Sequence, residues 1–208
     1  SEEEILDEIN KINTDSSIHG VIVQLPLPKH ISVTKVLNSI DPSKDVDGFT
    51  PSNVGKLFLG EDTLVSCTPK GIMSILKSAD VNLTGMNVTV IGRSNIVGKP
   101  VSILCQQQNA TVTMCHSKTR DLNAKLADAD VIIVAAGVPK FINGDQIPNG
   151  AVVVDVGIHN IEGKLCGDVE FESASKKASA ITPVPGGVGP MTVCALIENT
   201  IIAAERSS

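Results

Sequence analysis

Apolar residues follow a helical rhythm at the start of the chain. Positions 5, 6, 9 and 12 are apolar and share one helix face, and the opening Ser-Glu-Glu-Glu forms a capping box, so we predict a helix over residues 2–13. The β-branched run Ile18–Leu25 predicts a buried strand that ends at Pro26. Ser32 predicts the cap of a short apolar helix, and a polar loop then leads into a turn-rich stretch near residue 60.

Further along, the pattern alternates between strands and helices. Thr68-Pro69 predicts a helix start, with Thr as the cap and Pro in the first helical position. The segments that follow predict strands over residues 86–91, 111–115, 130–135 and 151–156, helices over 96–107 and 121–128, and a terminal helix over 191–204. Such alternation predicts an α/β fold with a parallel sheet and right-handed crossovers.

This pattern predicts two domains. We expect a Rossmann-like α/β domain of the dinucleotide-binding type over residues 67–181, and a smaller, discontinuous α/β domain built from residues 1–66 and 182–208. The cleft between two such domains is a usual place for a small-molecule site.

Charge and composition bear on whether the protein binds nucleic acid, a membrane or a metal ion. The net charge of −6 provides no general attraction to nucleic acid, and no apolar run approaches the roughly 18 residues that span a bilayer. The first residues are acidic, unlike a secretory or mitochondrial leader. Five scattered cysteines have no metal-binding spacing, so we predict reduced thiols, a cytoplasmic protein and no metal site.

The segment from Val90 to Gly98 joins a predicted strand to a predicted helix. In Rossmann folds this turn places a pyrophosphate on the amides of a helix N-terminus. Here Ser94 and Val97 replace two glycines of the usual Gly-x-Gly-x-x-Gly pattern, so the segment alone is equally compatible with an ordinary turn.

The end of the next predicted strand favours NADP over NAD. NAD enzymes usually carry an acidic residue there, which binds the ribose 2′-hydroxyl. This chain has Cys-His-Ser-Lys-Thr-Arg at residues 115–120 and no acid before Asp121, which fits better as a helix cap. Together with Arg93 and Ser94, these groups suit a 2′-phosphate, although a solvated basic edge is the alternative.

Four stretches together resemble the bifunctional methylenetetrahydrofolate dehydrogenase/methenyltetrahydrofolate cyclohydrolase family, in the same order and over the whole chain. They are Val-Gln-Leu-Pro-Leu-Pro at 23–28, Lys-Asp-Val-Asp-Gly-Phe at 44–49, Gly-Arg-Ser-Asn-Ile-Val-Gly at 92–98 and Ile-Thr-Pro-Val-Pro-Gly-Gly-Val-Gly-Pro-Met-Thr at 181–192. The resemblance implies NADP-dependent oxidation of 5,10-methylenetetrahydrofolate and hydrolysis of the methenyl product to 10-formyltetrahydrofolate. It also implies a homodimer that serves one-carbon metabolism and purine biosynthesis.

The resemblance assigns roles to individual residues. The implied cofactor contacts are Gly92, Arg93 and Ser94 in the loop, Ser117 at the 2′-phosphate and Ile158 at the nicotinamide. The implied catalytic and folate-binding residues are Gln24, Asp47, Gly189 and Thr192.

The side-chain chemistry of these residues is compatible with the implied roles, but each residue also has a purely structural alternative. The Gln24 amide can position a water for hydrolysis, or only form a hydrogen bond at the end of a strand. The Asp47 carboxylate can accept two bonds from a pterin, or only shape an Asp-Gly turn. We interpret Asp45 as loop-shaping, and His116 and His159 as structural.

The family also carries an upstream Tyr-x-x-x-Lys motif, whose Lys is regarded as its central catalytic residue. The present sequence has no Tyr, and its start matches the family interior, so we expect it to be part of a longer polypeptide. A polypeptide that truly began at Ser1 is expected to lack cyclohydrolase activity and to retain little dehydrogenase activity. Two alternatives stay open, namely an NADP-binding module or pseudoenzyme without that Lys, and another two-domain NADP dehydrogenase of the shikimate or malate type.

Overall fold

The computed structural model describes residues 1–207 and divides the chain into two compact units. The smaller unit contains Ser1–Cys67 together with the chain from Cys194 onward, and the larger unit contains Thr68–Val193. Residues 182–193, which we expected in the smaller domain, therefore belong to the larger unit.

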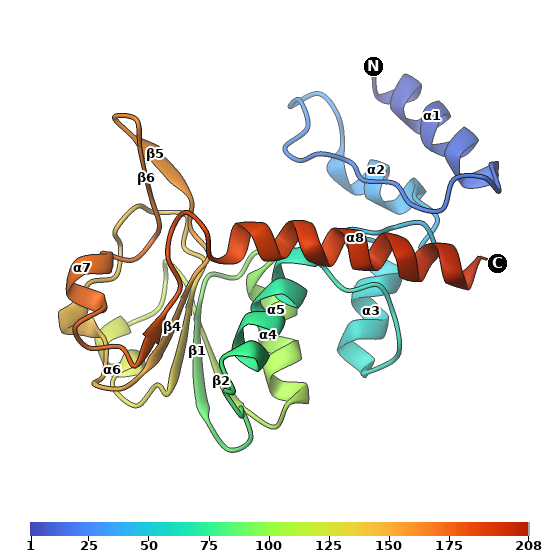
Figure 1. Ribbon diagram of the computed structural model, residues 1–208. Helices are drawn as coiled ribbons and strands as arrows, with labels where there is room; N and C mark the ends of the chain where they lie inside the picture. Colours follow the sequence, from blue (N-terminus) through green and yellow to red (C-terminus); the bar gives the residue numbers. More distant parts are fainter. Residues whose placement is uncertain (208) are drawn as a thin grey trace. The chain divides into compact units, whose positions relative to one another are not determined.

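The larger unit is built on a five-stranded sheet with the order β2-β1-β3-β4-β7 (Figure 1). Every pairing in this sheet is parallel, which confirms the predicted parallel α/β fold. The strands are β1 (Asn87–Ile91), β2 (Thr111–Cys115), β3 (Val131–Val134), β4 (Val152–Asp155) and β7 (Ala180–Ile181).

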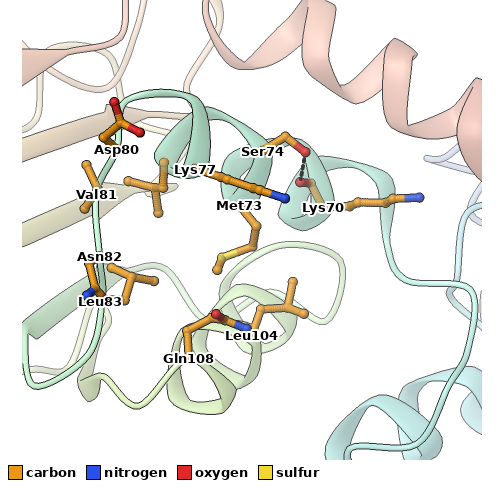
Figure 2. Close-up of a pocket in the computed structure, with 11 residues that line it drawn as sticks. Lys70, Met73, Ser74, Lys77, Asp80, Val81, Asn82, Leu83, Leu104 and Gln108 are labelled. Atoms are coloured by element: carbon orange, nitrogen blue, oxygen red, sulfur yellow. Dashed lines mark hydrogen bonds between the residues drawn. The ribbon is translucent and has the colours of Figure 1, made fainter.

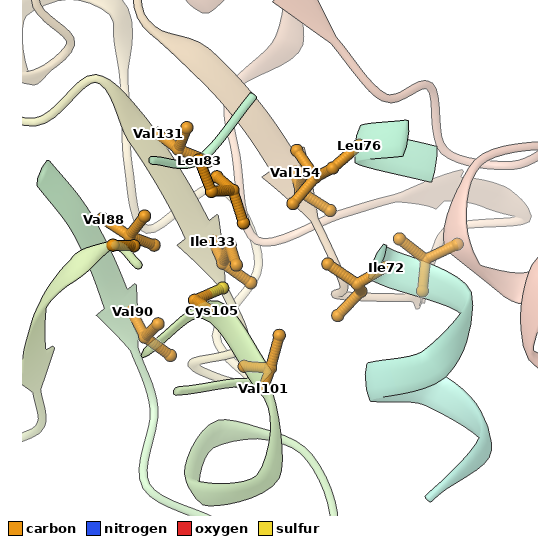
Figure 3. Packing of buried hydrophobic residues seen from close by; sticks show 12 residues of the cluster. Ile72, Leu76, Leu83, Val88, Val90, Val101, Cys105, Val131, Ile133 and Val154 are labelled. Carbon is orange, nitrogen blue, oxygen red and sulfur yellow. The ribbon is translucent and has the colours of Figure 1, made fainter. Parts of the chain in front are cut away.

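Apolar side chains project from both faces of this sheet, and this explains why the central strands are largely hydrophobic. On one face, Val131 and Ile133 pack with residues of α4 (Cys67–Ser78) and α5 (Gly98–Gln107), as Figure 3 shows. On the other face, Ile132 and Val134 pack near α6 (Leu122–Leu126) and α7 (Phe171–Ala174). The two clusters fix the sheet from both sides.

Several element boundaries differ from the prediction. Helix α4 begins at Cys67, so Thr68 lies inside the helix and does not cap it. Helix α5 begins at Gly98, two residues later than expected, because residues 95–97 form a turn. The antiparallel hairpin β5 (His159–Ile161) and β6 (Lys164–Cys166) and the short 3-10 helix Gly144–Gln146 were not predicted.

In the smaller unit, the two helices that carry N-cap serines form as predicted. They are α1 (Glu2–Thr14), whose capping box uses Ser1 and Glu4, and α2 (Val33–Ser39), capped by Ser32. Their apolar faces share one small core.

Two expectations for the smaller unit were wrong. Within residues 1–207, the predicted buried strand Ile18–Leu25 forms one β-bridge, Val21 to Asp45, and none of its residues is fully buried. A strand needs a neighbouring ladder, and the apolar run itself does not reveal whether one is present. The expected turns near residue 60 follow a third helix, α3 (Pro51–Leu59), which begins after Thr50 and ends at Gly60 with a φ of 77°.

The terminal helix α8 (Val188–Arg206) is longer than predicted. With 19 residues and a mean hydropathy of 1.2, it is long and apolar enough, by length and composition alone, to cross a membrane, which our search for an apolar run missed. Of its apolar 18-residue window, 22% is buried, and the side chains of Val193, Ile197 and Ile201 are more than half exposed. Val188 belongs to the core of the larger unit, while Ala203 packs with Val46 and Leu64 in the smaller unit.

Candidate functional site: the carboxyl edge of the sheet

The carboxyl ends of the parallel strands carry most of the predicted site residues. The chain runs from β1 to β2 on one side and then to β3 on the other side of β1, so the strand order reverses at β1. In open α/β sheets, ligands bind outside the carboxyl ends of the strands at such a switch point.

Two glycines let the backbone of the loop after β1 pass close to other backbone atoms. Gly92 has a φ of 128°, and a Cβ placed on it would lie 2.2 Å from the Ala135 carbonyl oxygen. A Cβ on Gly98 would lie 2.2 Å from the Gly92 carbonyl oxygen. Since backbone atoms cannot yield as side chains do, both positions require glycine.

Ser94 completes the turn into α5. Its hydroxyl oxygen accepts hydrogen bonds from the Val97 and Gly98 amides, at 3.1 and 3.3 Å, and so satisfies two amides where the chain enters the helix. The hydroxyl proton is not used in these bonds and can be donated to a ligand oxygen.

The loop after β2 lies beside this turn. Ile91 pairs with Cys115, and the Gly92 amide donates to the Cys115 carbonyl at 2.9 Å. Arg93, Ser94 and Ser117 are all exposed there. The side chain of Asp121 accepts from the Ala124 amide and caps α6, in agreement with its interpretation as a cap. The chemistry of this edge therefore fits a dinucleotide with a 2′-phosphate.

A cavity of about 470 Å³ lies along the ends of β4 and β7. Three predicted residues, Ile158, Gly189 and Thr192, line it. The Ile158 side chain is 65% exposed, and the hydroxyls of Thr192 and Thr68 lie 3.1 Å apart. The larger unit thus gathers an apolar side chain and polar groups around one space large enough for a ring.

Sequence reasoning missed two buried carboxylates at this edge of the sheet, Asp155, which lines the cavity, and Asp168. Asp155, at the end of β4, accepts from the amides of Gly157, Asp168 and Val169, each at 2.9 Å. Burial raises the pKa of its carboxyl group, while these three amides oppose that shift. A Cβ on Gly167 would lie 1.8 Å from an Asp155 oxygen. The available signal was an acid that ends an apolar strand and is followed two positions later by glycine.

The predicted folate residue Asp47 lies in the smaller unit. Its half-buried carboxylate is approached by the Cys67 thiol at 3.8 Å, its one hydrogen-bond donor among residues 1–207. Burial, and next the charge of Asp45, raise the pKa of the Asp47 carboxyl group, and the thiol opposes this shift. Asp47 therefore keeps most of its acceptor positions available for a ligand.

Asp45 has a different environment. It is 1% exposed, and one of its oxygens accepts from the Thr50 amide at 2.7 Å and the Asn53 side chain at 2.9 Å. These bonds agree with the loop-shaping interpretation.

Gln24 is exposed in the smaller unit. Its side-chain amide donates to the adjacent Leu25 carbonyl at 3.2 Å. This weak local bond leaves the amide oxygen available.

A second cavity, of about 600 Å³, lies between α4 and α5 (Figure 2). Met73, Ser74, Lys77 and Gln108 are among its lining residues, and none of the predicted site residues is. Within residues 1–207, no three His, Cys, Asp or Glu side chains are grouped so that they could hold a metal ion.

The fold and the paired loops define a dinucleotide-binding α/β protein of the dehydrogenase type. Two family models match the chain: the NAD(P)-binding domain of tetrahydrofolate dehydrogenase/cyclohydrolase over residues 66–208, and the catalytic domain of the same family over residues 1–47. The chain therefore belongs to the tetrahydrofolate dehydrogenase/cyclohydrolase family.

Individual relatives agree. The bifunctional protein FolD of Geotalea daltonii is 59% identical over 99% of this chain and 74% of its own length, and that of Bacillus subtilis is 56% identical over 100% and 74%. The crystal structure of the FolD methylenetetrahydrofolate dehydrogenase/cyclohydrolase from Campylobacter jejuni superposes with a TM-score of 0.97 at 50% identity, over 99% of this chain and 74% of that one. The Trypanosoma brucei enzyme, solved with NADP cofactor and an inhibitor, gives 0.95 at 39% identity, over 100% and 73%.

Proposed function

We propose that this protein oxidises 5,10-methylenetetrahydrofolate with NADP and hydrolyses the methenyl product to 10-formyltetrahydrofolate. The observation that carries the proposal is the pair of adjacent loops after β1 and β2, beside a cavity lined by Ile158, Gly189 and Thr192. Relatives that are more than 55% identical over the whole chain are bifunctional FolD proteins.

The larger unit binds the cofactor, and NADP, when bound, accepts a hydride from the folate. Arg93 and Ser117 hold the 2′-phosphate by charge-assisted and hydroxyl bonds. Ser94 donates its hydroxyl proton to a phosphate oxygen, and the glycines at 92 and 98 let the backbone approach. Ile158 offers an apolar contact for the nicotinamide ring.

The proposed folate-binding residues are Asp47, Gln24, Gly189 and Thr192. Asp47 accepts two bonds from the amino group and ring N–H of the pterin, a geometry that a carboxylate provides and a hydroxyl does not. Gly189 and Thr192 bind along the cavity. Gln24 orients the water that attacks the methenyl carbon.

The remaining finer expectations belong to the same proposal. We infer a cytoplasmic homodimer that acts on tetrahydrofolate derivatives and binds neither nucleic acid nor membrane. The net charge of −6 supports the absence of nucleic acid.

A coupled assay tests the proposal. The full-length protein, purified from its native source, is mixed with 5,10-methylenetetrahydrofolate and NADP, and NADPH and 10-formyltetrahydrofolate are measured separately. Both products are expected, and Asp47→Asn should reduce both because both reactions use the same bound folate. Binding of NADP without either product would favour the binding-module alternative. Absence of binding would refute the proposal.

A further inference from the structure

Asp168 is a fully buried charged residue to which the proposed function gives no role. Its side chain has no exposed surface. A buried carboxylate costs several kcal/mol unless hydrogen bonds replace its water. Both oxygens of Asp168 are satisfied, and they bond to two different segments of the chain.

The two segments border the same edge of the sheet. One Asp168 oxygen accepts from the Gly137 amide, in the loop after β3, at 2.8 Å. The other lies 2.7 Å from Nε2 of His159, the residue that follows Ile158. Asp168 thus ties the loop after β3 to the start of β5, directly after the loop that follows β4.

The backbone on the other side of Ile158 is also held against Asp168. A Cβ on Gly157 would lie 2.4 Å from the Asp168 amide nitrogen and from one of its carboxylate oxygens. The Gly157 amide in turn donates to Asp155. Both neighbours of Ile158 are therefore fixed, while the Ile158 side chain itself is 65% exposed and lines the cavity.

We infer that Asp168, acting through His159, is a positioning residue that fixes Ile158 as a platform for the nicotinamide half of the dinucleotide. This inference rests on the proposed function and deepens it. The adenosine half is held further along the same edge of the sheet, by the loops after β1 and β2, whereas the Asp168 side chain bonds to Gly137 and His159. Loss of the Asp168–His159 bond should therefore weaken binding of the nicotinamide half of the dinucleotide and leave binding of the adenosine half unchanged.

The test compares two ligands. NADP carries the nicotinamide, whereas 2′,5′-ADP carries only the adenosine and the 2′-phosphate. Their dissociation constants are measured by calorimetry for the wild type and for His159→Ala, which keeps the Asp168–Gly137 bond and is a smaller disturbance than a change at Asp168. We expect NADP to bind about tenfold more weakly, as for the loss of one well-placed contact, and 2′,5′-ADP to bind as before.

Two further variants distinguish a positioning role of His159 from a general loss of folded structure. His159→Gln places an amide N–H near the position of Nε2 and should restore NADP affinity. Glu170→Gln is the matched control, because Glu170 is a carboxylate two residues from Asp168 whose side chain only caps α7. This control should leave both dissociation constants unchanged.

Activity provides a second readout. His159→Ala should lower the dehydrogenase rate and leave the cyclohydrolase rate unchanged, because hydrolysis transfers no hydride. An equal loss of affinity for both ligands, or wild-type affinity for NADP, would overturn the inference while leaving the proposed function standing. A wild-type protein that binds neither ligand would overturn both.

Discussion

Two aspartates in the same loop, Asp45 and Asp47, are predicted to have different roles. Removing Asp45 should lower the stability of the fold, whereas removing Asp47 should weaken ligand binding. Asp45 is buried and bonds to the Thr50 amide and the Asn53 side chain, which are themselves 2% and 3% exposed. Asp47 is half-buried, and in the described part of the chain its carboxylate accepts one hydrogen bond, from the Cys67 thiol. The first side chain therefore serves the fold, and the second is available to a ligand.

The magnitude for Asp45 follows from its two bonds. A hydrogen bond to a charged group contributes about 1.5–3 kcal/mol, and its loss leaves a buried donor unsatisfied. Asp45→Ala should therefore lower the free energy of unfolding by about 3 kcal/mol. Asp47→Ala should change the free energy of unfolding by no more than about 0.5 kcal/mol, as at most surface positions, and weaken folate binding by about 10- to 100-fold.

The assay is urea unfolding of both variants, followed by circular dichroism, together with calorimetric titration of folate. Asp45→Asn keeps one acceptor oxygen and should recover part of the stability. Equal losses of stability in the two alanine variants would refute the reasoning, as would Asp47→Ala with unchanged folate affinity.

The pH dependence gives an independent check on Asp47. Burial raises its pKa in the folded protein, so the carboxylate that binds folate is lost, as pH falls, at a higher pH than for an ordinary Asp. Folate affinity should fall through that window. For stability the sign is opposite: because the folded state keeps this proton to a higher pH than the unfolded chain, Asp47 makes unfolding easier as pH rises through the same window. Asp47→Ala should remove both effects.

Three further changes test the larger unit. Gly92→Ala should lower the free energy of unfolding by about 2 kcal/mol or more, because of its positive φ and its approach to a carbonyl; wild-type stability in urea would contradict this. Arg93→Ala should weaken NADP binding about 10- to 100-fold and leave NAD binding unchanged in calorimetry, whereas Asp121→Ala should leave the ratio of the two affinities unchanged, since Asp121 caps a helix. Burial raises the pKa of Cys105 to about 12, so iodoacetamide at pH 8 should alkylate exposed Cys194 and spare Cys105 in the native protein, as judged by mass spectrometry of peptides.

Local sequence signals predicted most of the larger unit. Strand β3 is a run of four apolar residues that are all buried, and β1 is buried from Val88 to Ile91, so the pattern is visible in the local sequence. The turn after β1 was also predictable, because glycines at 92 and 98 mark a backbone that passes close to other backbone.

The roles of the two loop aspartates illustrate where residue type alone is insufficient. Asp45 and Asp47 are identical side chains separated by one residue, and only their neighbours distinguish them. The resemblance to a known family suggested which one binds a ligand, and the hydrogen bonds of Asp45 agree with its structural role.

The sequence by itself determined the strand–helix alternation, the cofactor loop and the absence of an acid before Asp121, because each depends on residues close together in the chain. Only the tertiary structure decided that Ile18–Leu25 is not a buried strand and that Asp168 joins the loop after β3 to the start of β5. These features depend on partners that lie many positions away, such as Gly137, 31 residues before Asp168. A local pattern can report what a residue prefers, but the partner that satisfies it is chosen when the chain packs.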